Sequence, residues 1–160
     1  MQQNFIDPVS ICIFAGAKVM ILNRKFLKFE IDLDFVLIAV TTSQKDYRIC
    51  YLINKNLNFN FTKAPDLAVD MAEYSAPVLF SLYHYTTNDD ETDCYFIANK
   101  GTEGYLIPEM RKADFFLMIK NHIGESELDR LVSALNKIPE VVAAVKIDPK
   151  KIKSRENLLF

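Results

Sequence analysis

The chain has 160 residues, of which 50% are hydrophobic and 25% are charged, and its formal net charge is −2. This length suits one domain, and the composition is opposite to that of disordered chains. The near-neutral charge excludes a global attraction to nucleic acid or to acidic membranes, so such a partner would need a local basic patch.

Residues 1–19 form an N-terminal leader that does not match a targeting signal. No basic residue precedes its apolar part, Asp7 and Pro8 interrupt it, and the uncharged run is far shorter than the ~20 residues of a membrane span. Met20 opens a segment with the pattern of an ordinary domain start. We therefore hypothesise that Met20 is the native start and that the leader is not part of the native domain.

The three cysteines, Cys12, Cys50 and Cys94, are far apart and form no CxxC or Cys/His motif. This pattern favours reduced, buried thiols in a cytoplasmic protein over a disulfide framework or a metal site. Only His84 and His122 are present to assist a thiol. His84 lies between two tyrosines, and we interpret it as a packing residue.

Residues 20–147 are predicted to form a single α+β domain, because they contain no repeat, low-complexity tract or linker. Strand patterns cover 26–34 and 35–40. Residues 43–57 fit both a strand and a helix. Ser43 with Asp46 three residues later resembles a capping box, which favours the helix.

Two short extended pieces, 59–63 and 67–71, are predicted on either side of a turn at Ala64-Pro65-Asp66, because proline biases its predecessor to extended geometry. Residues 78–86 and 94–99 are predicted to pair as a hairpin with an acidic, solvated tip.

The second half of the chain is predicted to contain a strand that begins at 105–107, a helix and a last strand. The helix covers about 126–138, where leucine, valine and isoleucine recur at helical spacing and Pro139 prevents continuation. Residues 141–147 have the β-branched composition of a strand.

The segment 106–119, LIPEMRKADFFLMI, contains the natural candidates for a catalytic carboxylate pair, Glu109 and Asp114. In an extended chain their α-carbons would lie roughly 16 Å apart and on opposite faces, too far to act on one substrate bond. We therefore predict a structural strand that starts after a kink at Pro108 and is buried from Ala113 to Ile119.

Both faces of this strand need cover, because its apolar side chains alternate between the two faces from Phe115 to Ile119. The run 35–40 makes the same demand. Two helices on one face leave the other open. The second face is therefore predicted to be covered by the N-terminal segment, by a strand-rich second layer or by a partner subunit.

Residues 148–160 form a basic C-terminal tail that contains Lys150, Lys151, Lys153 and Arg155. One interpretation is a strip that contacts RNA, with Tyr47 or Tyr51 stacking on bases. We favour a solvated tail whose last three residues, 158–160, dock on the domain or on another protein.

Three stretches carry a resemblance to a known family: 106–115 (LIPEMRKADF), 46–55 (DYRICYLINK) and 153–160 (KSRENLLF). Together they resemble a bacterial family named for its motif, the IPExxxVDY proteins, over about residues 20–160. Ala113 and Phe115 replace the motif's Val and Tyr, and both keep an apolar residue. The resemblance implies a small cytoplasmic protein with a helix at 43–57, and it implies no particular activity.

The predicted fold class is α+β, an antiparallel β-sheet with two helices packed on one face, similar in outline to ferredoxin-like or ACT-like sandwiches. No nucleotide-binding, hydrolase or zinc-protease motif occurs in the sequence, so no cofactor or metal is predicted.

The predicted function is a non-enzymatic, cytoplasmic binding or adaptor module that contacts a protein partner or a second copy of the chain, and not a membrane. RNA binding through the basic tail is the alternative. An enzyme of unrecognised type comes third, and a deep pocket grouping Glu109, His84 and Cys94 would favour it. The candidate binding residues are Glu109, Arg111, Asp114, Lys150, Lys151, Lys153 and Arg155.

Overall fold

The structure is a computed structural model that describes residues 33–87, 92–121 and 123–160. Its strands are β1 (Phe35–Thr42), β2 (Thr62–Val69), β3 (Val78–Thr86), β4 (Asp93–Ala98), β5 (Phe115–Lys120) and β6 (Val141–Ile147). Its helices are α1 (Asp46–Leu57) and α2 (Glu125–Leu135), and short 3₁₀ turns occur at η2 (Pro108–Met110), η3 (Pro149–Lys151) and η4 (Arg155–Leu158). The leader 1–19, Cys12 and most of the predicted strand 26–34 and of the hairpin tip lie outside the described residues.

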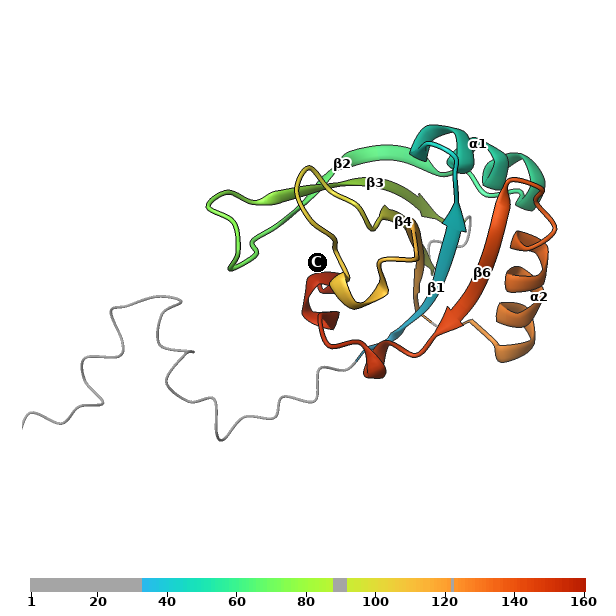
Figure 1. The fold of residues 1–160 in the computed structure, drawn as a ribbon. Coiled ribbons are helices and arrows are strands. Elements are labelled where there is room, and N and C mark those ends of the chain that lie inside the picture. The colour runs from blue at the N-terminus through green and yellow to red at the C-terminus, as the bar shows by residue number, and fades with distance from the viewer. Residues whose placement is uncertain (1–32, 88–91, 122) are drawn as a thin grey trace, which may run out of the picture. The chain divides into compact units, whose positions relative to one another are not determined.

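The strands form one antiparallel sheet in the order β2-β3-β4-β5-β1-β6. Both helices pack on the same face, which we call the helix-side face (Figure 1). The predicted α+β class, with an antiparallel sheet and two helices on one face, is confirmed. The element order matches a ferredoxin-like βαββαβ outline in which β3 and β4 are added between β5 and β2.

Most predicted elements occur near their predicted bounds. Strands β3 and β6 begin and end where the sequence pattern placed them, and β3 pairs with β4 as the predicted hairpin. The helix predicted at 43–57 is confirmed as α1, although it begins at Asp46. The helix predicted at 126–138 ends earlier, at Leu135.

Two local predictions are wrong. No turn separates two strands at Ala64-Pro65-Asp66, because β2 runs through these residues. Its register against β3 shifts between Ala64 and Leu67, and a bulge on an edge strand accommodates a proline that cannot donate a ladder hydrogen bond. No strand begins at 105–107 either, since Tyr105 makes only an isolated bridge to Lys100 before η2 begins.

The central strands bury side chains on both faces. In β5, Phe115, Leu117 and Ile119 belong to the helix-side core, while Phe116 and Met118 belong to a second core on the opposite face. This alternation confirms the two-sided burial that the sequence predicts.

The opposite face, which we call the tail-side face, is covered by two irregular segments: the loop 99–114 and the C-terminal segment 148–160 (Figure 1). Their buried apolar residues are Leu106, Ile107, Ala113, Ile152 and Leu158. The sequence analysis predicted that this face is covered by an N-terminal segment, a second strand layer or a partner subunit. None of these three includes the loop 99–114 and the C-terminal segment, which cover this part of the face. Irregular segments bury apolar residues without a periodic pattern, so that periodicity does not reveal them.

Asn99, fully buried after the end of β4, holds the loop 99–114 in place. Its Nδ2 donates to the carbonyl oxygens of Met110 and Ala113 at 2.9 and 2.8 Å, and its Oδ1 accepts from the Ile107 N–H at 2.9 Å. Its own N–H and carbonyl bond to Asp114 and Leu106. One amide side chain thus satisfies three backbone groups of the loop.

Both edge strands are capped by an asparagine side chain in the same way. Asn54 of α1 exchanges two hydrogen bonds with the backbone of Phe61, next to β2. Asn136, at the end of α2, does the same with Ala144 of β6. An amide side chain that pairs with a strand residue in this way occupies the position that an added strand would take.

Replacing Asn99 with alanine is expected to lower the free energy of unfolding by about 3 kcal/mol, because three backbone groups of the loop lose their partner. Urea denaturation measures the difference. The matched control is Asn56→Ala, since Asn56 lies on the exposed side of α1 and bonds only to Leu52. A loss for Asn99→Ala that is no larger than that of the control would contradict the assigned role.

Replacing Asn136 with alanine is expected to increase self-association relative to the wild type, because it uncovers the N–H and carbonyl of Ala144 on an edge strand that already exposes Val142. Sedimentation velocity over a series of protein concentrations measures the effect. If the variant loses stability but sediments like Asn56→Ala at every concentration, Asn136 does not protect the edge.

Candidate functional site

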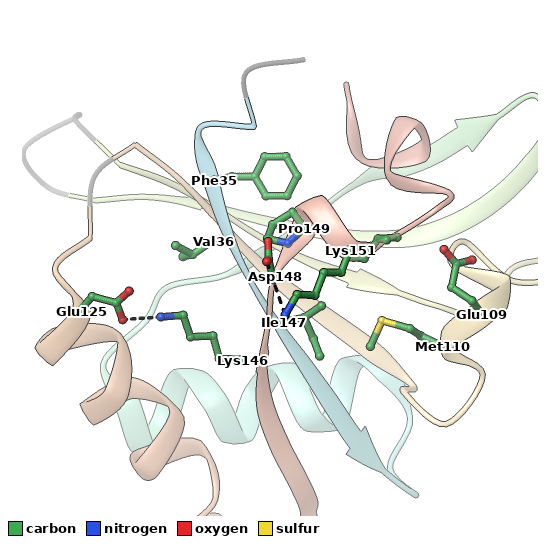
Figure 2. A pocket seen from close by; sticks show the side chains of 11 residues that line it. Phe35, Val36, Glu109, Met110, Glu125, Lys146, Ile147, Asp148, Pro149 and Lys151 are labelled. Carbon is green, nitrogen blue, oxygen red and sulfur yellow. Dashed lines mark hydrogen bonds and ion pairs between the residues drawn. The ribbon is translucent and has the colours of Figure 1, made fainter. Parts of the chain in front are cut away.

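A groove lies at the β6 edge of the sheet, between the start of β1, the end of β6, the start of α2 and the turns η2 and η3 (Figure 2). Its residues Phe35, Met110, Ile147 and Ile152 pack on the tail-side core, whereas Val36 and Glu125 come from the helix side. Its volume is about 720 Å³. The apolar part of its lining consists of Phe35, Val36, Met110, Ile147, Pro149 and Ile152, and the charged part of Glu109, Glu125, Lys146, Asp148 and Lys151. We call this opening the tail-side groove.

A second cavity of about 530 Å³ continues the groove along β6 and shares Glu109, Met110 and Ile147 with it. Val145 lines this part and is 53% exposed, although it is a large apolar residue. Arg111 and Lys112 border the same part. The tail-side groove with its continuation is therefore an open apolar surface with cations at its rim.

Glu109 fastens the C-terminal segment to η2. Its carboxylate accepts hydrogen bonds from the N–H groups of Lys153 (2.7 Å) and Ser154 (2.9 Å) and from the Ser154 hydroxyl (2.9 Å). Burial alone would raise the pKa of Glu109, but these hydrogen bonds, together with one from its own N–H, outweigh burial and hold the pKa below its usual range. Nearby, Asn157 donates to the carbonyl of Leu106.

Asp114 and Arg111 have separate roles at the surface. The Asp114 carboxylate accepts from the Thr42 N–H at 2.8 Å. The guanidinium of Arg111 lies 5.5 Å from the centre of the Tyr105 ring. Glu109 and Arg111 line the same cavity, whereas Asp114 lines a different one.

The two carboxylates are thus held apart, as predicted, but the predicted reason is wrong. Glu109 lies in a 3₁₀ turn and Asp114 directly precedes β5, so that the chain between them is not extended. Different hydrogen-bond donors hold the two groups, and strand geometry does not separate them.

The basic residues of the C-terminal segment are only partly available. Lys150, Lys151 and Lys153 are exposed, and Lys151 lies 4.0 Å from Asp148. Arg155 is half-buried and donates to the carbonyl of Lys150 at 3.2 Å, so it helps to close the segment on itself. The predicted docking of the tail on the domain is seen for Leu158, which is buried, and for Phe160, whose ring meets Tyr95 edge to face although it stays partly exposed. Leu159 is also partly exposed.

Tyr47 and Tyr51 are exposed on α1, which packs on the helix-side face. The C-terminal segment covers the tail-side face. The structure therefore does not bring the tyrosines and the basic tail together into one strip.

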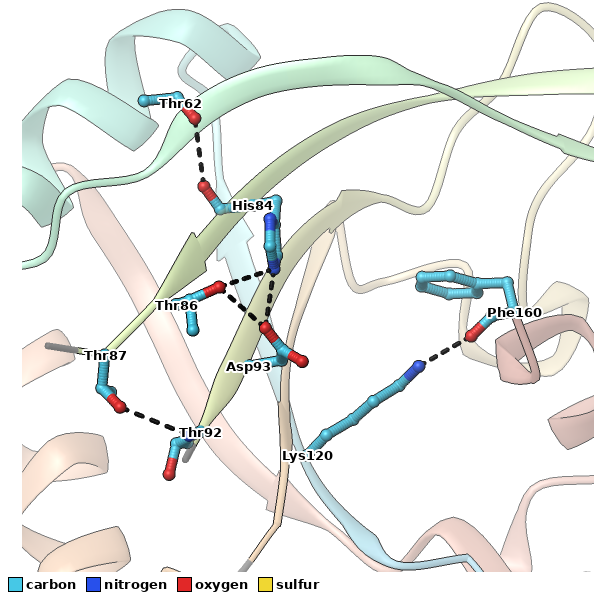
Figure 3. Close-up of polar contacts among 8 residues, drawn as sticks. All are labelled: Thr62, His84, Thr86, Thr87, Thr92, Asp93, Lys120 and Phe160. Carbon is cyan, nitrogen blue, oxygen red and sulfur yellow. Dashed lines mark hydrogen bonds and ion pairs between the residues drawn. The ribbon is translucent and has the colours of Figure 1, made fainter. Parts of the chain in front are cut away.

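His84 takes part in a polar cluster on β3 and β4 (Figure 3). Its Nε2 lies 2.9 Å from an oxygen of Asp93, which also accepts from the Thr86 hydroxyl at 2.9 Å. These hydrogen bonds lower the pKa of Asp93. The imidazole stacks on Tyr95, with ring centres 4.7 Å apart, in agreement with a packing role.

Close to this cluster, Lys120 connects β5 to the end of the chain. Its ammonium group donates to the Phe160 carbonyl at 2.7 Å and lies 4.9 Å from the centre of the Tyr95 ring. The Tyr95 and Phe160 rings meet edge to face.

The pocket of Glu109, His84 and Cys94 that would favour an enzyme is not formed by these three residues. Cys94 points into the helix-side core, whereas the ring partner of His84, Tyr95, packs against the tail-side core. Burial, with a further contribution from Asp93, raises the pKa of Cys94 to about 11. Burial and the charge of Asp46 raise the pKa of Cys50 to about 12. Both thiols are therefore neutral at physiological pH.

Among the residues that the structure describes, no group of three His, Cys, Asp or Glu side chains could hold a metal ion. Within the same residues, no helix is both long and apolar enough to cross a bilayer. The arrangement of the tail-side groove is suited to binding an apolar group between fixed charges.

Sequence reasoning missed several apolar residues that line the tail-side groove, among them Met110, Val145, Ile147 and Ile152. A signal exists only for β6, where odd-numbered residues share one face of an edge strand and Val145 and Ile147 are therefore expected together.

Comparison of the chain with protein-family models, curated proteins and solved structures found no match. Membership of the IPExxxVDY family stays a prediction that rests on the three stretches quoted above.

Replacing Glu109 with glutamine is expected to lower the free energy of unfolding by about 1 kcal/mol at pH 7, since charge-assisted hydrogen bonds are lost at a site that solvent screens. The folded-state pKa of Glu109 is depressed, so its stabilisation is present at neutral pH and is lost as the pH falls through that pKa. The difference between wild type and variant should therefore shrink below about pH 4.

Urea denaturation at several pH values measures this difference, and hydrogen exchange at Ile152 and Leu158 reports release of the C-terminal segment. Glu103→Gln is the matched control, because Glu103 is exposed and has no hydrogen bond or ion pair with a described residue. A difference that is the same at pH 3 and pH 7 would contradict the assigned role of the carboxylate.

Proposed function

We propose that this protein is a non-catalytic, cytoplasmic binding module that contacts a protein partner through the tail-side groove. The observation that supports the proposal is an open apolar floor, with Val145 about half exposed, beside Arg111 and Lys112, which form no ion pair with a described acid. Exposed apolar surface with a polar rim is typical of protein interaction sites.

The charge of the rim indicates the chemistry of the partner. The exposed cations are Arg111, Lys112, Lys150, Lys151 and Lys153. Of the acids nearby, Glu109 binds the C-terminal segment and Glu125 pairs with Lys146, while Asp148 accepts from the Lys150 N–H and lies 4.0 Å from the Lys151 ammonium group. The partner segment should therefore combine an apolar anchor with carboxylates.

The capped edge of the sheet favours a partner that docks through side chains over one that adds a strand. A partner that added a strand to β6 would have to displace Asn136 from Ala144. A partner that docks on the tail-side groove leaves this pairing intact. We therefore propose docking on the face of the sheet and not strand addition.

RNA binding through the basic tail remains the alternative. Three exposed lysines support it, but Arg155 is used within the segment and no exposed tyrosine of α1 lies on that face. Four cations or fewer give a weak, strongly salt-dependent affinity for a phosphate backbone.

The variant Val145→Glu tests the proposal, because it places a carboxylate in the apolar floor beside the partner's own acids. Wild type and variant are immobilised and exposed to lysate of the native cell, and the captured proteins are quantified. We expect a protein with an acidic, apolar segment that binds the wild type and loses at least about tenfold in affinity with the variant when both are purified.

Val142→Glu is the matched control. Val142 is also a valine of β6 and is 74% exposed, but it lies at the register shift and lines neither part of the tail-side groove. Equal effects of the two variants on the purified complex would contradict the proposal.

Two further measurements separate the other possible partners. Sedimentation shows whether the partner is a second copy of the chain. A salt-dependent shift of labelled RNA that is lost in the triple variant Lys150→Gln/Lys151→Gln/Lys153→Gln would favour the RNA-binding alternative.

A further inference from the structure

A separate opening lies on the helix-side face, where the end of α1 diverges from α2 over the sheet. Its volume is about 360 Å³, at the small end of the roughly 300–1,000 Å³ range of ligand pockets. Its lining within the described residues consists of Leu57, Phe59, Thr87, Thr92, Cys94, Ile119, Ile123, Glu127, Arg130, Leu131 and Ala134. We call this opening the interhelix pocket.

The wall of the interhelix pocket is apolar and incompletely buried. Leu57, Phe59, Ile123 and Leu131 all pack against the helix-side core but stay partly exposed. A ligand that fills the pocket removes this apolar surface from water, which favours binding in proportion to the area covered.

The floor of the interhelix pocket is neutral. Cys94 and Ile119 are 2% exposed, and burial keeps the Cys94 thiol in its uncharged form. The inner part of the pocket therefore suits a hydrocarbon group and disfavours a charged one.

Among the described residues, the rim of the pocket carries one charge of each sign. Glu127 and Arg130 are both exposed, three residues apart on α2, and neither has an ion pair with the other or with another described residue. Side chains at this spacing lie roughly 5–6 Å apart at their β-carbons. One small ligand can therefore reach both, with a carboxylate on Arg130 and an ammonium group on Glu127.

We propose that the interhelix pocket binds a small zwitterion with an apolar side chain, which is the chemistry of a branched or aromatic α-amino acid. The hydrocarbon group lies on Cys94 and Ile119, and the charged groups lie at Arg130 and Glu127. Among the described residues that line the pocket, Arg130 is the only cation and Glu127, one helical turn away, is the only carboxylate, so that the described lining favours neither a phosphate group nor a metal ion.

Isothermal titration calorimetry and amide chemical-shift mapping with L-leucine and L-phenylalanine test the proposal on the full chain. Binding is expected to be weakened about tenfold or more by Arg130→Gln and by Glu127→Gln, because each removes one charge-assisted contact. The same loss is expected for 4-methylpentanoate, which lacks the ammonium group, for 3-methylbutylamine, which lacks the carboxylate, and for glycine, which lacks the side chain.

Arg48→Gln on the exposed side of α1 is the matched control and should bind like the wild type. Ala134→Leu, which narrows the pocket, should abolish binding while circular dichroism shows an unchanged fold. The proposal is overturned if neither L-leucine nor L-phenylalanine shows binding at ligand concentrations up to about 10 mM. It is equally overturned if 4-methylpentanoate or 3-methylbutylamine binds as well as leucine, or if shifts map away from α2.

Discussion

The buried amide of Asn99 is the interaction on which the tail-side half of the molecule depends. It supplies two donors and one acceptor to the backbone of a loop that has no regular secondary structure of its own. That loop positions η2, and Glu109 of η2 then holds the C-terminal segment by its backbone N–H groups. Because Ile152 and Leu158 are buried only when this segment is docked, the order of dependence runs from one asparagine to the cover of a whole sheet face.

This dependence explains how strands with apolar residues on both faces exist in a chain with only two helices among its described residues. β1 and β5 are interior strands of the sheet, and residues 37–40 of β1 and 115–119 of β5 are buried on both faces. Exposing the tail-side face would cost roughly 1.5–3 kcal/mol for each large side chain. The loop and the C-terminal segment avoid that cost by covering the face. The loop then has buried backbone groups, which need the hydrogen bonds that Asn99 provides.

The sequence was sufficient for the elements whose patterns are local. The two-sided burial of β5, the apolar stripe of α2 and the hairpin of β3 with β4 follow from alternation or helical spacing. It was insufficient where tertiary contacts decide. The edge position of β2 allows Pro65 within a strand. The roles of Asn99, Asn54 and Asn136 depend on backbone groups seven to fourteen residues further along the chain, in a different element or loop, which periodicity does not encode.

For the candidate site, the sequence-based binding residues Glu109 and Arg111 line the continuation of the tail-side groove, and their role in binding stays a prediction. The carboxylates of Glu109 and Asp114 both accept hydrogen bonds from backbone N–H groups. Asp46 similarly accepts from Ser81 and Tyr83. These carboxylates stay ionised, but none of them forms an ion pair with a described lysine or arginine. A chain with a formal net charge of −2 can therefore present exposed cations at the rim of the tail-side groove, because the positions at which the acids are held decide the local charge that a partner meets.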